Sequence, residues 1–345
     1  MEIDNKNQGY LKDKFYVDLL AKLKSAGARV VDINTIEVSS EILGKARNTI
    51  YKGKFEGKTV AVKVKSKITI RSDVKSFIRE ITIGHSIFHE RIPKVICVAV
   101  GEKEVYVVID IIENAKSIVN KCKEVSYSQQ IDYMVQLANI IKDLHNMNII
   151  HRDINPTNIM VDDNNIVHLT NFGLSKELKS GEVTATIDSK GSVKYLAPEL
   201  FIFIEDDDDD DKDKDGDGDT ETKRKMEEPP NPNVGFFNDI WSLGCVISES
   251  LSQIHPWDNL DWDSFDYKKL DIKKKTVISD IVVAEVLTSN KVPFPIPIDL
   301  QAPLKDILKL CFKLDKNERA DIHDLAEKLR EYNIQLKSNC CCICF

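Results

Sequence analysis

The amino-acid sequence predicts an α+β protein of two lobes, a small lobe built on an antiparallel sheet with one helix and a larger, mainly helical lobe. Three observations support this prediction. The chain has 345 residues, which is long for a single compact core. Short runs rich in Val and Ile alternate between 36 and 109, as antiparallel strands do. Beyond 113 the apolar residues recur mostly at helical spacing.

The first predicted element is a helix over 10–26. Its apolar residues recur at helical spacing; they are Leu11, Phe15, Leu19, Leu20 and Leu23. Gly27 follows them and is a good helix stop. We expect this helix, part of an N-terminal extension over 1–35, to pack on the small lobe rather than to bind a partner.

The small lobe is predicted over 36–112. Its strands are expected at 36–38, 50–53, 59–64, 95–100 and 105–109. One helix over 73–89 interrupts them, and its buried stripe consists of Phe77, Ile78, Ile81 and Ile87. The order of strands and helix predicts an antiparallel sheet that packs against a single helix.

The large lobe is predicted over 113–333. Its clearest amphipathic helix covers 128–146, and its most apolar helix covers 239–251. A disordered acidic insertion is expected at 205–233, and a Cys-rich tail at 334–345. The scattered cysteines before the tail are expected to be small core residues.

The acidic insertion has low complexity. Residues 205–221 contain 12 acidic residues and two lysines, a charge of -10, which leaves about +2 for the rest of a chain whose total is -8. Such a block cannot bury a core. Residues 211–216 match the start of a calcium-binding loop, but Gly218 and Thr222 stand where two ligand positions belong. No amphipathic helices flank the block, so a solvated loop is favoured over a calcium site.

The C-terminal tail gathers four of the chain's eight cysteines. Cys342 begins a match to a prenylation box that ends in Phe345, and Cys340 and Cys341 are candidates for palmitoylation. Two attached lipids give the stable membrane anchor that one alone rarely gives. A free thiol tail and a metal cluster remain open as alternatives, the latter disfavoured because no histidine accompanies the cysteines.

Composition indicates an ordinary cytoplasmic protein. Apolar residues make up 42% and charged residues 30% of the chain, and no apolar run approaches the roughly 18 residues that span a bilayer. The first residues resemble no signal sequence, and Glu2 stands where myristoylation needs glycine. We therefore expect a cytoplasmic location, with the lipid tail as a route to the cytoplasmic face of a membrane, and no nucleic-acid partner.

Two motifs carry the chemistry. The first is His151-Arg152-Asp153-Ile154-Asn155-Pro156-Thr157-Asn158, and the second is Asn171-Phe172-Gly173. With Val60-Ala61-Val62-Lys63 they resemble the catalytic motifs of serine/threonine protein kinases of the tyrosine-kinase-like group, over about residues 36 to 333. The resemblance implies the bilobal protein-kinase fold, with ATP and Mg²⁺ as cofactors and a protein as substrate or scaffold partner.

The resemblance also implies a role for each matching residue. Asp153 would be the catalytic base, and Lys63, paired with Glu80, would hold the phosphates. Asn158 and Asn171 would be the metal ligands. The nucleotide would be bound by three groups of residues: Leu43, Gly44, Ala46 and Asn48 at the phosphate loop, Ile50, Ala61 and Met160 on the two sides of the base, and Ile109, Asp110 and Ile112 at the gatekeeper and hinge.

Further matches lie in the large lobe. Ala197-Pro198-Glu199 resembles the end of the activation segment, Arg319 its ion-pair partner, and Asp239 the residue that braces the catalytic loop. The segment before them holds hydroxyl residues that are candidates for phosphorylation, with Arg152 as the docking cation; they are Thr184, Thr186 and Ser189. Plain loop residues are the alternative.

Four departures from the kinase pattern weaken the metal and phosphate side. The phosphate loop keeps one glycine, Gly44, and is one residue short. Asn155 replaces a lysine that normally touches the γ-phosphate. Gly84 replaces a bulky side chain one turn after Glu80, where a gap is expected. Asn171 replaces the aspartate that binds Mg²⁺, and an amide keeps an oxygen but loses the charge.

Two functions therefore stay open from the sequence. One is a pseudokinase that acts as a scaffold or switch in intracellular signalling through its shape. The other is a slow serine/threonine kinase that uses Asp153 as its base and holds its metal weakly at Asn158 and Asn171. The first is favoured, because the departures concentrate on the metal and phosphates.

Overall fold

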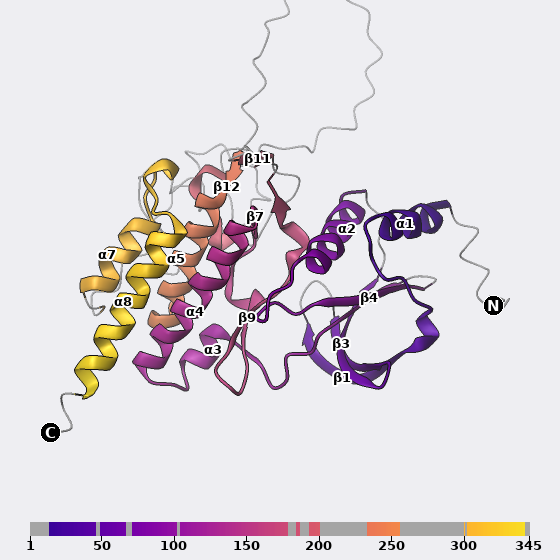
Figure 1. Cartoon of the computed structure of the whole chain (residues 1–345), viewed down its shortest axis with the longest axis horizontal. Coiled ribbons are helices and arrows are strands. Elements are labelled where there is room, and N and C mark those ends of the chain that lie inside the picture. Colours follow the sequence, from indigo (N-terminus) through magenta and orange to yellow (C-terminus); the bar gives the residue numbers. More distant parts are fainter. Residues whose placement is uncertain are drawn as a thin grey trace, which may run out of the picture.

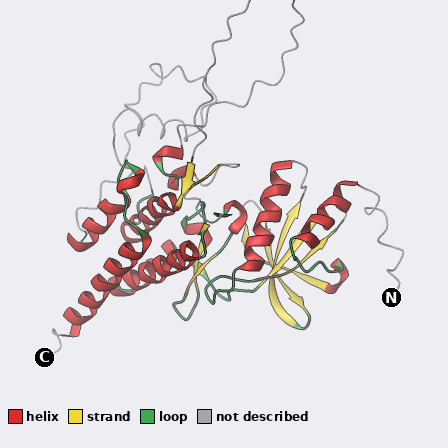
Figure 2. Cartoon of the chain, turned by 45° about the horizontal axis from the view of Figure 1, so that its top comes forward, coloured by secondary structure: helices red, strands yellow, loops and turns green. Residues whose placement is uncertain are grey.

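The computed structural model describes residues 14–45, 49–66, 71–101, 104–178, 184–186, 193–200, 233–255, 300 and 302–341. Strands gather in a small N-terminal lobe and most helices in a larger C-terminal one (Figure 2). This arrangement confirms the predicted bilobal α+β fold. Among the described helices, none is long and apolar enough to cross a membrane.

The small lobe is a five-stranded antiparallel sheet in the order β1-β2-β3-β5-β4. Its strands are β1 (Ile36–Lys45), β2 (Thr49–Phe55), β3 (Lys58–Ser66), β4 (Val95–Val100) and β5 (Glu104–Ile109). β1 is longer than predicted because it continues beyond Val38, through two irregularities in its pairing with β2. At Gly53 an added Cβ would lie 2.5 Å from the Glu37 carbonyl oxygen, so only glycine fits there.

Two helices pack beside this sheet, α1 (Lys14–Ser25) and α2 (Arg71–Ser86) (Figure 1). The α1 side chains Leu19 and Leu23 are 1% and 0% exposed and share a core with Phe77 and Ile81 of α2. The predicted packing of the first helix on the small lobe is therefore confirmed. The chain after α1 also bonds to the sheet, since Val30 forms a parallel bridge with Val98 of β4.

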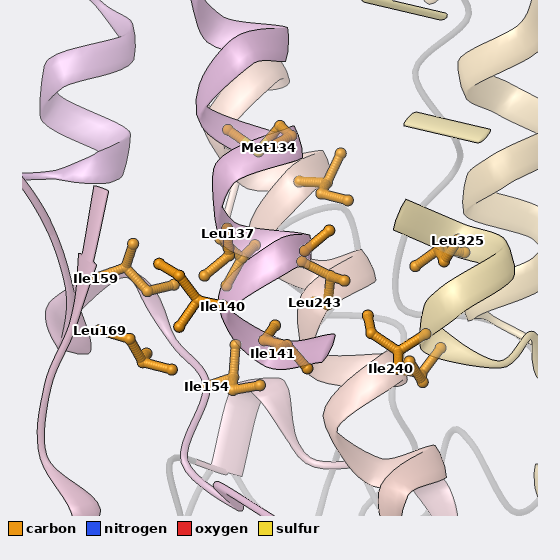
Figure 3. Close-up of a cluster of buried hydrophobic side chains, with 14 of the residues drawn as sticks. Met134, Leu137, Ile140, Ile141, Ile154, Ile159, Leu169, Ile240, Leu243 and Leu325 are labelled. Carbon is orange, nitrogen blue, oxygen red and sulfur yellow. The ribbon is translucent and has the colours of Figure 1, made fainter. Parts of the chain in front are cut away.

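The large lobe packs its helices around α4. The helices are α3 (Ile118–Cys122), α4 (Tyr127–Asn146), α5 (Phe236–Ser252), α7 (Ala302–Cys311) and α8 (Ile322–Cys341). Figure 3 shows part of this core, in which Ile140 of α4 lies on the side of Ile159 and Leu169, and Leu243 of α5 lies on the other side of α4. Residues at helical spacing on α4 are fully buried, as the sequence pattern predicts.

Short strand pairs complete the large lobe. A three-stranded sheet runs β6-β8-β9, and two pairs join β10 to β7 and β11 to β12. Their bounds are β6 (Lys116–Ser117), β7 (Ile149–Ile150), β8 (Ile159–Val161), β9 (Val167–Leu169), β10 (Lys176–Glu177), β11 (Thr184–Thr186) and β12 (Asn233–Gly235). β7 and β8 flank the loop that holds the His151–Asn158 motif.

Several predictions fall on residues that the structure does not describe. The acidic block at 205–221 lies outside the described residues, and so does Cys342. α8 continues beyond 333 to Cys341, so the first part of the predicted tail is helical, but the side chains of Cys340 and Cys341 are not described. Calcium binding, lipidation and membrane attachment therefore stay predictions.

Candidate functional site

Asp239, near the start of α5, fixes the backbone of the loop between β7 and β8. Its carboxylate accepts the amide protons of His151 and Arg152, both at 2.9 Å, and lies 3.0 Å from His145 Nε2. Burial alone would raise the pKa of Asp239, but these hydrogen bonds hold the pKa below its ordinary value. An ionised, fully buried carboxylate thus sets the shape of the loop.

Asp153 is surrounded by three side-chain amides. Asn155 Nδ2 donates to its Oδ1 at 3.0 Å, while Asn158 Nδ2 and Asn171 Nδ2 donate to its Oδ2 at 2.9 and 3.1 Å. Hydrogen bonds to an ionised acceptor are stronger than neutral ones. The carboxylate is therefore held in one position by donors from its own chain.

Lys63 on β3 and Glu80 on α2 form an ion pair across the small lobe. Their side chains are 11% and 14% exposed, so solvent screens the pair only in part. Lys63 Nζ also lies 3.5 Å from Asn171 Oδ1. The pair that the kinase resemblance implies is present, and its ammonium group lies near the side chain of Asn171.

Asn171 has a left-handed backbone, with φ 69° and ψ 72°, a conformation that Asn and Asp tolerate better than most residues. Its side chain spans the site. Nδ2 donates to Asp153 and to Asn158 Oδ1, the latter at 3.2 Å, and Oδ1 faces Lys63. The residue thus links β3 to the catalytic loop through both ends of its amide.

The rings of His151 and Phe172 contact each other edge to face, with their centroids 5.0 Å apart. His151 Nδ1 accepts the amide proton of Asp153 at 3.3 Å, which leaves Nε2–H to donate to the Thr170 carbonyl at 3.1 Å. Burial lowers the pKa of His151, in agreement with a neutral ring. The short turn Phe172–Leu174 also packs against α2.

Comparison with known proteins identifies the family of this chain. A model of the protein kinase domain matches residues 41–216. The chain belongs to the protein kinase family. Kinases of this family use ATP and Mg²⁺ in general.

Its kinase relatives are distant and much longer. The chain is 29% identical over 296 residues to mitogen-activated protein kinase kinase kinase A of Dictyostelium discoideum, covering 83% of this chain and 26% of that protein. It is 27% identical over 279 residues to mitogen-activated protein kinase kinase kinase 1a of Physcomitrium patens, covering 80% and 30%. Dual specificity protein kinase shkE of Dictyostelium discoideum is 24% identical over 310 residues, covering 86% and 36%. The chain spans about a quarter to a third of the length of these relatives.

The predicted nucleotide residues of this kinase domain lie on several strands of both lobes. Ile50 on β2 is paired with Lys63, and Ala61 on β3 is paired with Ile109 at the end of β5. Met160 lies on β8 of the large lobe, and Leu43 and Gly44 lie near the end of β1. Ala46 and Asn48 fall outside the described residues. The nucleotide-binding role of these residues stays a prediction.

The hinge segment after β5 is tied to the connection before β4. The amide of Asp110 donates to the Lys94 carbonyl at 3.0 Å, and the Asp110 carboxylate accepts the Lys94 amide at 3.1 Å. A cavity of about 340 Å³ is lined by this hinge segment through Ile112, by parts of the 87–94 connection and by His168. Lys63, Asp153 and Asn171 do not line it, so the cavity is separate from these three residues.

The end of the activation segment is anchored on the large lobe. Arg319 binds Glu199 through two hydrogen bonds of 2.7 Å, and its guanidinium lies 4.9 Å from the Trp241 ring centroid. Asn238 also donates to Glu199, at 2.7 Å. The ion pair expected from the kinase pattern is therefore present, with the Arg319 side chain fully buried.

The candidate phosphorylation sites lie in the segment before this anchor. Thr184 and Thr186 are in β11, which pairs antiparallel with β12, and their side chains are not described. Ser189 lies outside the described residues. Phosphorylation of these residues stays a prediction.

In this arrangement the side chains of Asn158 and Asn171 do not present the oxygen ligands that a divalent cation needs. Mg²⁺ requires oxygen ligands, usually with a carboxylate among them. Asn171 instead turns its nitrogen toward Asn158 Oδ1 and Asp153 Oδ2. Within the described part of the chain, no three His, Cys, Asp or Glu side chains gather as metal ligands either.

One expectation at α2 is wrong. Gly84 was expected to leave a gap where kinases place a bulky side chain. In the structure a Cβ added at Gly84 would lie 2.8 Å from Val95 Cγ2. The first residue of β4 therefore occupies the space, and the missing side chain is compensated by a residue of the strand that follows α2.

Asn155 has a role that the kinase pattern did not reveal. Besides its bond to Asp153, its Oδ1 accepts the Thr157 amide at 2.9 Å and caps the short turn Pro156–Asn158. An Asn directly before Pro at a turn is a common capping pattern. That pattern could have predicted the cap, although not the bond to Asp153.

Proposed function

We propose that this chain is a nucleotide-binding protein kinase domain of intracellular signalling, in which phosphotransfer is slow or absent and the domain acts as a scaffold or switch. The observation that carries the proposal is the side chain of Asn171. It binds Asp153 and Asn158 through its nitrogen, while Lys63 and Glu80 remain paired. The site thus keeps the lysine that would bind the phosphates, but Asn171 lacks the negative charge that would bind a metal ion.

The lost charge sets the expected rate. A carboxylate at 171 stabilises the metal and the charge that develops on the transferred phosphoryl group. If that stabilisation is on the order of 4 kcal/mol, its loss slows transfer about a thousandfold, because about 1.36 kcal/mol corresponds to tenfold. A kinase that turns over at roughly 1 to 100 per second would then turn over at only about 0.001 to 0.1 per second.

A slow serine/threonine kinase is the second candidate. Asp153 stands in a loop braced by Asp239, and the His151–Phe172 stack and the Lys63–Glu80 pair are complete. Most of the parts that position a nucleotide and an acceptor hydroxyl are therefore present. The relatives named as mitogen-activated protein kinase kinase kinases support this direction.

Restoring the charge separates the two candidates. Phosphotransfer from ATP to a generic acceptor protein, or to the chain itself, is measured for the wild type, Asp153→Asn, Asn171→Asp and the double variant Asn171→Asp with Asp153→Asn. We expect little or no transfer by the wild type and a rise of about 10²–10³-fold for Asn171→Asp. The double variant is the control and should lose this gain. Fast transfer by the wild type that Asp153→Asn abolishes would contradict the scaffold proposal and establish the kinase.

A further inference from the structure

The orientation of the Asn171 amide is determined by opposite neighbours on its two sides. Asp153 Oδ2 and Asn158 Oδ1 accept from Nδ2 at 3.1 and 3.2 Å, and Lys63 Nζ lies 3.5 Å from Oδ1. Turning the amide over would place its oxygen against a carboxylate and its nitrogen against an ammonium group. Both contacts are repulsive, so the observed orientation is the stable one.

This orientation uses the oxygens that a divalent cation would need. Asn171 Nδ2 binds one oxygen of Asp153 and one of Asn158. The other oxygen of Asp153 accepts from Asn155. N–H groups and a metal ion compete for the same lone pairs, and here the N–H groups belong to the protein itself.

The net charge of the site also affects whether a bound nucleotide needs a metal ion. Lys63 carries one positive charge, and Glu80 and Asp153 carry one negative charge each, which gives a net charge of -1 for this group of bonded side chains. An aspartate at 171 would make it -2 and would repel nucleotide phosphates unless a cation lay between them. The amide removes that repulsion and leaves the Lys63 ammonium as the nearby cation.

We propose that Asn171 replaces the divalent cation in this domain, so that the cleft binds a nucleoside triphosphate as the metal-free anion. Lys63 supplies the positive charge for the phosphates, and Glu80 holds its ammonium in place. The three amides on Asp153 screen that carboxylate from the phosphates. This inference rests on the proposed function, because it requires the nucleotide in this cleft.

Calorimetry of ATP binding to the full chain tests the proposal, once with EDTA and once with excess Mg²⁺. We expect the wild type to bind ATP in EDTA at least as tightly as with Mg²⁺. Asn171→Asp should reverse this order and bind at least about tenfold more weakly in EDTA than with Mg²⁺, because a second carboxylate then needs a counterion. Lys63→Met is the control and should lose binding in both conditions.

The outcomes separate this inference from the proposed function. Wild-type binding that requires Mg²⁺ overturns the inference alone, and so does an Asn171→Asp variant with the wild-type order of affinities. Absence of ATP binding in both conditions overturns the proposed function and the inference together. A Lys63→Met variant that binds ATP like the wild type overturns the inference alone, because Lys63 would then not supply the charge for the phosphates. The wild-type comparison needs no variant, so it stands even where Asn171→Asp folds poorly.

Discussion

Asn155 connects the geometry of the turn Pro156–Asn158 to the position of the Asp153 carboxylate. Its side chain is almost fully buried, accepts one backbone proton and donates to one carboxylate oxygen. Loss of a cap costs about 1 kcal/mol, and a buried donor–acceptor pair adds a similar amount. Asn155→Ala should therefore lower the free energy of unfolding by about 1–3 kcal/mol in urea titrations.

Two comparisons make the Asn155 result specific. Asn164→Ala, in a turn where the Asn164 side chain is exposed, should change the free energy of unfolding by less than about 0.5 kcal/mol. Asn155→Asp keeps an oxygen for the Thr157 amide but sets a second carboxylate beside Asp153. Should Asn155→Asp prove as stable as the wild type, the bond to Asp153 would have no energetic importance.

His151 should make the free energy of unfolding depend on pH. Burial lowers the pKa of the folded ring, so the unfolded chain binds more protons as the pH falls below about 6.5. Stability is then fully present above the unfolded pKa and decreases as the pH falls toward the folded one, by up to about 1.4 kcal/mol per pH unit. Urea titrations of the wild type between pH 7.5 and pH 5.5 measure this slope.

His151→Phe is the matched variant, because it keeps an aromatic ring against Phe172 and removes the titrating group. We expect a lower overall stability, since the bond to the Thr170 carbonyl is lost, but a flatter dependence on pH. Equal slopes for the two proteins over this range would assign the dependence to other groups.

Among the helices, α1 contributes to the stability of the small lobe. Leu23 is fully buried against the core that contains Phe77 and Ile81 of α2, the helix that carries Glu80. Leu23→Ala should lower the free energy of unfolding by about 2–5 kcal/mol through the cavity it leaves. Val17 on the same helix is 45% exposed, and Val17→Ala should change stability by less than about 0.5 kcal/mol.

The same pair of variants tests how α1 acts on the site. If α1 holds α2 in the position that pairs Glu80 with Lys63, Leu23→Ala should also weaken ATP binding, and Val17→Ala should leave it unchanged. An unchanged ATP affinity at a temperature where Leu23→Ala is still folded would limit α1 to a stabilising role.

The sequence predicted the helices, the strands and the motif residues well. It predicted poorly how side chains of different elements contact one another. Lys63 and Glu80 were predicted together because each matches a position of the kinase motifs, in which a strand lysine pairs with a glutamate of the following helix. Gly84 was misjudged because Val95, which fills its space, comes from a strand that periodicity cannot align with it. The orientation of Asn171 was also beyond prediction, since Lys63 and Asp153 determine it from two different lobes.

The Glu199–Arg319 ion pair joins the end of the activation segment to the chain just before α8. Removing one partner of a buried ion pair leaves an uncompensated charge and costs about 3–5 kcal/mol. Glu199→Gln should therefore lower the melting temperature clearly. Asp306→Asn, in an exposed pair with Lys309 whose side chains are 70% and 62% exposed, is the control and should have little effect.

The pairing of β11 with β12 has a consequence for chain length. Thr186 lies opposite Asn233, and Glu199 between them is bound by Arg319, so the described residues on both sides of 201–232 are held on the large lobe. Residues 201–232 carry the acidic block at 205–221. For a flexible loop with fixed ends, each doubling of length costs only about 0.6 kcal/mol. Residues can therefore be added to or removed from the acidic block with little change in the free energy of folding, which makes this insertion a place where the length of the chain can vary while the catalytic loop keeps its geometry.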